Sequence, residues 1–195
     1  MKHILTTMVA AMTIVSCANN SGTNPFLTEW DTPYGIPPFE QIGIDDYMPA
    51  INAGIEQQNA AIATITSNAE EPTFDNTIAP LELSSGILDK VSGVLYNISE
   101  TDRTDELDSI VELAIPVMTE HSDNISFNQA LFQRIAKLYE GDQSSLTREQ
   151  QMVLKKYYEQ FQRSGSGLPQ DKQDQLRKIN TEMASKQQKI GNNIL

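Results

Sequence analysis

Histidine and cysteine are the side chains best suited to metal binding and nucleophilic catalysis, and this chain of 195 residues has few of them. It contains two histidines, His3 and His121, and one cysteine, Cys17. A zinc hydrolase of the H-E-x-x-H type needs two histidines four residues apart on one helical face, with a glutamate between them that activates water. No histidine here is followed by glutamate, and one cysteine excludes cysteine-rich zinc sites and C-x-x-C redox motifs. The sequence therefore predicts no catalytic residue and no metal ligand.

Catalysis by a Ser-His-Asp triad would have to use His121, which has Asp123 two residues further on. Proximity in sequence says little about such a triad, because its members are brought together by the fold from distant positions. We therefore interpret His121 as a structural residue near the carbonyl end of a helix.

Two polar groups could suggest an ion-binding site. Asp102, Asp105, Glu106 and Asp108 form an acidic cluster. Its spacing does not fit an EF-hand loop, and acidic side chains are favourable at a solvated helix start. The segment 163–167, which reads RSGSG, lacks the lysine and the preceding strand of a P-loop. It is interpreted as an ordinary turn.

An aromatic group could suggest a ligand platform. Tyr157, Tyr158 and Phe161 lie close together in a segment with helical periodicity. Their spacing is that of a helix face packed against a core, and this is the interpretation we favour.

The first residues have the features of an export signal. Lys2 precedes an apolar stretch, residues 4–15, that is shorter than the roughly 20 residues needed to span a bilayer. The ending Ile-Val-Ser-Cys at positions 14–17 resembles the lipobox of bacterial lipoproteins. This predicts a signal peptide over residues 1–16, lipidation of Cys17 and a polar tether over residues 17–23. The alternative is that Cys17 only lies near an ordinary cleavage site.

The charge balance restricts the partners. The formal net charge is −12 and the pI is about 4.5. Nucleic-acid binding needs a basic surface that neutralises phosphates, so this class is excluded. The same charge disfavours docking of the protein surface on anionic lipid, which leaves the lipid anchor as the contact with a membrane. We expect an exported, membrane-anchored protein that faces the periplasm or the cell exterior.

A segment rich in proline and aromatic residues follows the tether. Residues 24–43 contain four prolines, and each fixes φ and removes a backbone donor. No regular helix can run through such a segment, so it is predicted to be an extended strap. Its four aromatic residues are expected to attach it to a larger body. They are Phe26, Trp30, Tyr34 and Phe39.

Helical periodicity dominates the rest of the chain, and no strand alternation competes with it. The first helix is expected from near Tyr47, with Asp45 or Asp46 as its cap and Pro49 in its first turn. A second is expected from Phe74 to Leu95. A third is expected to contain Pro116, which should bend or interrupt it. Capping boxes are expected at Ser126–Gln129 and Thr147–Gln150, and a last helix from near Gln170. The fold class is therefore an all-α array of about six helices.

Longer blocks of the chain resemble a known family. They read NPFL at 24–27, TPYGIPPFEQI at 32–42 and YMPAINAGI at 47–55, and they continue over residues 70–98, 115–135 and 161–195. In this order they are similar to the start of the bacterial peptidyl-dipeptidase branch of the thimet oligopeptidase family of zinc metallopeptidases. The resemblance covers essentially all of the chain after Asn24.

The resemblance implies that residues 24–195 are the incomplete N-terminal helical domain of a larger, ellipsoidal peptidase. Such a parent would bind zinc and cleave short peptides, releasing C-terminal dipeptides, and this segment would form channel wall and scaffold. None of the quoted blocks holds the zinc motif, so this segment by itself is expected to be inactive and to bind no zinc. The last helical pattern runs to Ile194 and Leu195 without a capping signal, which favours a fragment. The alternative is a stand-alone, non-catalytic helical lipoprotein that binds peptides or a partner protein.

Overall fold

The computed structural model describes residues 23–194, and in this range it contains helices, turns and no strand. The principal α-helices are α1 (Ile44–Ser67), α3 (Gly86–Thr101), α4 (Asp105–Ser126), α5 (Gln129–Glu140), α6 (Arg148–Ser164) and α7 (Gln170–Ile194). A short helix, α2 (Ala79–Glu82), lies between a π-helical turn, Phe74–Ile78, and a 3-10 turn, Leu83–Ser85. The all-α prediction is confirmed.

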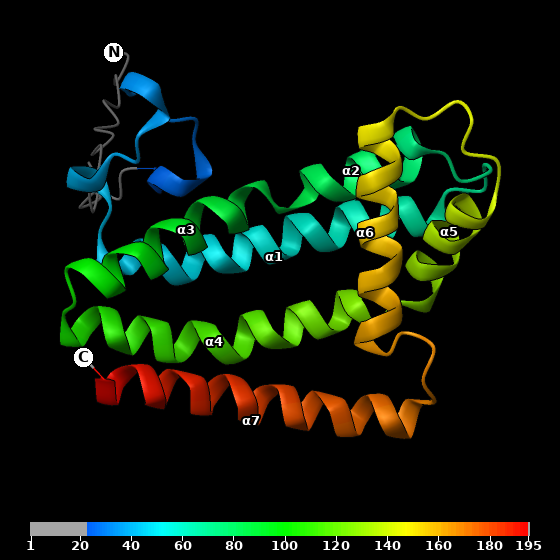
Figure 1. Cartoon of the computed structure of the whole chain (residues 1–195). Helices are drawn as coiled ribbons and strands as arrows, with labels where there is room; N and C mark the ends of the chain where they lie inside the picture. Colours follow the sequence, from blue (N-terminus) through cyan, green and yellow to red (C-terminus); the bar gives the residue numbers. More distant parts are fainter. Residues whose placement is uncertain (1–22, 195) are drawn as a thin grey trace, which may run out of the picture.

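Four long helices run side by side with alternating direction. α1 packs against α3 and α4, and α7 packs against the other side of α4. Figure 1 shows this stack, with α6 crossing it at one end beside α5 and the strap at the opposite end. In the described part, α7 is therefore an outermost layer that rests chiefly on a single helix.

The interior consists of two apolar clusters, one at each end of α1. The cluster nearer the strap joins α1, α3 and α4 through fully buried side chains such as Ile51, Val91 and Leu95. The other cluster joins the end of α1 to α5 and α6 through Leu131, Ile135 and other buried side chains. Burial of several large aliphatic side chains in each cluster, at about 1.5–3 kcal/mol each, is the main force that holds the helices together.

The strap, residues 24–43, is only partly attached. It contains three 3-10 turns, Pro25–Leu27, Pro33–Gly35 and Phe39–Gln41. Phe26 is fully buried against Tyr47, with ring centroids 5.3 Å apart, and Trp30 packs on the same cluster. The expectation that all four aromatic residues attach the strap is wrong, because Tyr34 is fully exposed and Phe39 is half exposed.

Several expected helix boundaries also need correction. α1 begins at Ile44, so Pro49 is its sixth residue and not part of its first turn. Asp46 accepts a hydrogen bond from the backbone N–H of Gly43, at 2.8 Å, three residues before it. The helix expected from Phe74 to Leu95 is divided among the π-helical turn, α2, the 3-10 turn and α3.

The capping boxes and the proline in the third helix had different outcomes. The box at Thr147–Gln150 is confirmed, since both reciprocal hydrogen bonds are present. The box at Ser126 is wrong: α5 is capped by Asn128, whose side chain accepts from the Leu131 N–H at 3.0 Å. α4 continues through Pro116, so this residue does not interrupt the helix.

Candidate functional site

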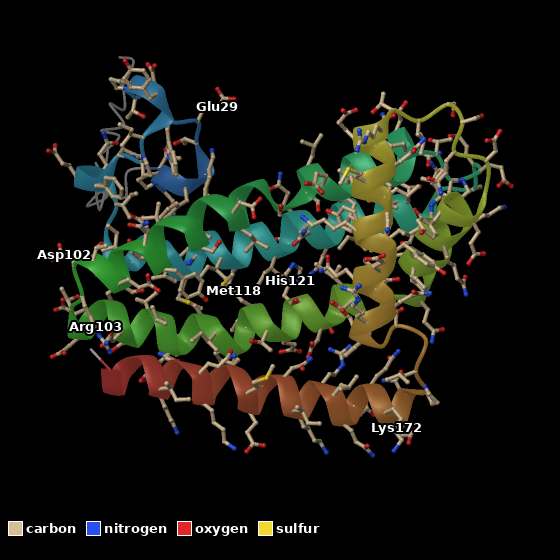
Figure 2. All side chains as sticks on the ribbon, in the orientation of Figure 1. Glu29, Asp102, Arg103, Met118, His121 and Lys172 are labelled. Carbon is tan, nitrogen blue, oxygen red and sulfur yellow. The ribbon has the colours of Figure 1, made fainter. Side chains whose placement is uncertain are left out.

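His121 lies in the interior and takes part in a chain of polar contacts. It is five residues before the end of α4 and is 7% exposed, so it is a structural residue as expected, although it does not lie in the last turn. Its Nε2 lies 2.7 Å from Oε1 of Gln58 on α1. Figure 2 shows His121 in the space between α1 and α4.

The partners of Ser84, Gln58 and His121 determine which group donates and which accepts in each of these hydrogen bonds. The hydroxyl of Ser84 donates to the carbonyl oxygen of Leu81 at 2.6 Å, so it accepts the hydrogen bond from Nε2 of Gln58 at 3.0 Å. The amide oxygen of Gln58 is then left to accept, and Nε2 of His121 must carry the proton. Burial lowers the pKa of His121 below its ordinary value of 6.5, because the imidazolium form loses its hydration. His121 is thus a neutral donor that links α4 to α1.

Asp123 does not complete a triad with His121. It is 6% exposed, and its Oδ1 accepts a hydrogen bond from Nδ2 of Asn180 on α7 at 2.6 Å. This contact ties α7 to α4. Both residues singled out for a possible triad therefore make interhelical contacts of their own.

The described residues do not fit a zinc site. Among residues 23–190, no three His, Cys, Asp or Glu side chains come together in a way that could hold a metal ion. His121, the histidine in this range, already uses Nε2 to bind Gln58. Cys17 and His3 lie outside the described residues.

Three of the four residues in the acidic cluster lie at a helix start, as expected, whereas Asp102 is the C-cap of α3; the RSGSG segment is an ordinary turn, as expected. Asp105, Glu106 and Asp108 lie in the first turn of α4, and Asp108 pairs with Arg103 at 2.8 Å. In the segment 163–167, Gly165 has φ of +88° and ends α6, while Ser166 is buried and donates to the carbonyl oxygen of Phe161.

The aromatic group on α6 is part of the packed interior. Phe161 is buried, and its ring lies parallel to that of Phe132 with centroids 5.9 Å apart. Tyr158 stacks on Tyr139 of α5 at 4.1 Å. Tyr157 donates to the carboxylate of Glu82, and burial together with this carboxylate raises the pKa of Tyr157. The interpretation as a packed helix face is confirmed.

The structure adds two grooves that were not found from the sequence, one along each side of α7. One has a volume of about 440 Å³ and is lined by apolar and amide side chains that include Met118, Met183 and Gln187. The other has a volume of about 870 Å³ and mixes the cations Arg177 and Lys189 with acidic residues. Both grooves form because α7 touches α4 along one stripe, and the periodicity of α7 alone does not reveal this arrangement.

Within the described part, no helix is both long enough and apolar enough to cross a bilayer. This finding concerns residues 23–194 and leaves the leader untested.

Comparison with known proteins identifies relatives along most of the chain. It is 32% identical over 163 residues to the dipeptidyl carboxypeptidase of Escherichia coli, a match that covers 83% of this chain. It is 29% identical over 164 residues to the dipeptidyl carboxypeptidase of Salmonella typhimurium, and 24% identical over 174 residues to the oligopeptidase A of the same organism. The resemblance to the thimet oligopeptidase family is confirmed. No protein-family model matches the chain.

The same matches cover only a small part of each relative's length. This chain spans 24% of the length of the E. coli and Salmonella dipeptidyl carboxypeptidases and 25% of the oligopeptidase A. These proportions are consistent with an N-terminal fragment of a thimet oligopeptidase-type peptidase.

Proposed function

We propose that this chain is the scaffold-forming N-terminal segment of a zinc metallopeptidase that cleaves short peptides and releases C-terminal dipeptides. The match to dipeptidyl carboxypeptidase over 83% of the chain carries the proposal. In this proposal the long helices form part of a channel wall that admits short, unfolded peptides. Zinc and the general base belong to the remainder of the peptidase.

The interior of the segment supports a scaffolding role. Its buried polar residues bind each other across helices, as Gln58 does with Ser84 and His121. Such contacts fix the relative positions of α1 and α4, and they use the polar atoms of these side chains within the segment. A rigid wall of this kind can hold a catalytic half in position, because positioning errors of about 1 Å reduce catalysis strongly.

The proposal can be tested by supplying the missing part. The full chain is joined through Leu195 to the residues of the E. coli dipeptidyl carboxypeptidase that lie beyond its matched segment. We expect the joined protein to release C-terminal dipeptides from a blocked tripeptide, and the chain alone to release none. In a control, Leu95→Asp places a charge in the core and should abolish activity of the joined protein. Peptide hydrolysis with bound zinc by the chain alone, or a folded, zinc-loaded joined protein without activity, would contradict the proposal.

A second candidate function is that of a stand-alone helical lipoprotein that binds peptides or a partner protein. One observation favours it: the described helices enclose two apolar clusters by themselves. A chain that melts cooperatively as a soluble monomer and binds a peptide library, combined with an inactive joined protein, would establish this candidate instead.

For the leader, we propose export and acylation of Cys17, which would place the protein at a membrane surface facing the periplasm or the cell exterior. The lipobox-like ending supports this. Radiolabelled palmitate should enter the wild-type chain and not a Cys17→Ser variant. Equal labelling of both proteins would show that Cys17 is not the anchor.

A further inference from the structure

The outer turn of the strap, residues 33–39 and here called the strap tip, presents apolar side chains to solvent. Tyr34 is 101% exposed, Ile36 51% and Phe39 49%. The same strap buries Phe26 completely. The strap therefore has an attached part and an outward part, and both carry aromatic residues.

The backbone of the strap tip has a defined conformation, although its apolar side chains make few contacts with the rest of the described residues. Tyr34 has φ of +60°, a left-handed conformation that is unfavourable for a residue with a bulky side chain. Hydrogen bonds close the turn, from Gly35 N–H to the Thr32 carbonyl oxygen at 3.1 Å and from the Thr32 hydroxyl to the Ile36 carbonyl oxygen at 2.5 Å. Pro33 inside the turn, and Pro37 and Pro38 directly after it, each have a φ angle fixed by their own ring. A preorganised, exposed aromatic turn loses little entropy on binding, which is a property of binding hot spots.

The charge around the strap tip restricts what can cover it. Residues 23–43 contain Glu29, Asp31 and Glu40 and no lysine or arginine, and all three acidic residues are exposed. Figure 2 shows Glu29 at the edge of the strap, above α3. These three exposed carboxylates are repelled by anionic lipid and by nucleic acid. They fit an apolar protein pocket that has a basic rim.

We propose that the strap tip docks, through Tyr34, Ile36 and Phe39, into an apolar pocket with a basic rim on the remainder of the peptidase. This inference rests on the proposed function. The occupant is taken from the proposed function and the length: this chain spans 24% of its E. coli relative, so most of such a peptidase lies outside this segment and offers a surface for docking. The docked strap tip would then hold this segment and the remainder of the peptidase together.

Proteolysis at glutamate provides a direct test, because Glu29 and Glu40 flank the strap tip. The full chain and the joined protein described above both carry Cys17→Ser, so that no lipid anchor can shield the strap. We expect cleavage by a glutamate-specific protease at these two residues to be at least about tenfold slower in the joined protein, since cleavage follows the population of the undocked state.

Variants separate docking from general stability. Tyr34→Ala with Phe39→Ala should remove the protection in the joined protein and leave cleavage of the chain alone unchanged. Met152→Ala is the matched control, because Met152 is 64% exposed on α6, away from the strap, and should change neither.

The outcomes distinguish this inference from the proposed function. An active joined protein that is cleaved at Glu29 and Glu40 as fast as the chain alone overturns the docking of the strap tip and leaves the proposed function standing. A folded, zinc-loaded joined protein that is inactive and is cleaved as fast as the chain alone overturns both. Protection of the chain alone by vesicles of phosphatidylcholine and phosphatidylglycerol, lost in the double variant, overturns the inference in favour of a membrane.

Discussion

Replacement of Gln58 by leucine would test the polar contacts between α1 and α4. Gln58 is 8% exposed, and its amide group connects two buried partners. Leucine has a similar volume, so the cavity term is small. The change removes the acceptor of the His121 N–H and the donor to the Ser84 hydroxyl.

The expected cost follows from which group is left without a partner. Ser84 keeps its hydrogen bond to the Leu81 carbonyl oxygen, so its loss is small. The N–H of His121 becomes a buried donor without an acceptor, which costs about 1–3 kcal/mol. His121→Leu leaves the Gln58 oxygen unpaired, with a cost of the same order. When both residues are leucine, neither group remains, and the double variant should recover most of the loss.

The assay is urea unfolding of the full chain at pH 7.5, followed by the helical circular dichroism signal. We expect each single variant to lower the free energy of unfolding by about 1–3 kcal/mol, and the double variant to lose clearly less than either single variant. Single variants within about 0.3 kcal/mol of wild type, or strictly additive losses, would refute the assignment of this hydrogen-bond chain.

Two other expectations concern pH and close packing. Because burial lowers the pKa of His121 from 6.5, only the unfolded state gains its proton as pH falls below about 6.5. The free energy of unfolding should therefore decline from this pH downward, and the decline should be shallower in His121→Leu; parallel curves would contradict it. Gly54 lies where an added Cβ would be 2.9 Å from the Leu88 side chain, so Gly54→Val should lower the free energy of unfolding by about 1–3 kcal/mol. Gly93 has open space around it, so Gly93→Ala should not lower the free energy of unfolding in this way.

The sequence allowed the helices to be predicted because their signals are local. Thr147 and Gln150 form the expected box, and Gly141 and Gly165 end α5 and α6. The errors occurred where several signals compete in a few residues. Asn128 caps α5 in place of Ser126, since α4 continues to Ser126 itself.

The interior contacts could not be predicted, because they join residues far apart in the sequence. Gln58 and His121 are separated by 63 positions, and neither carries a local signal for the other. The strap shows the same limit. Its composition indicated attachment, but which aromatic residues are buried depends on where Tyr47 and α3 lie.

Most buried polar groups in the described part are engaged with other groups of the same segment. A catalytic or binding site needs polar groups that are aimed at a space and left partly unsatisfied for the substrate. Arg134 instead uses its two terminal nitrogens to bind the carbonyl oxygens of Asn68 and Glu70 and the side chain of Asn76, and so joins α5 to the link after α1; its buried Nε has no partner. Asp123 and Asn180 likewise use their polar atoms on each other. In the described part these groups determine where helices lie, and this is what a scaffold for a catalytic half requires.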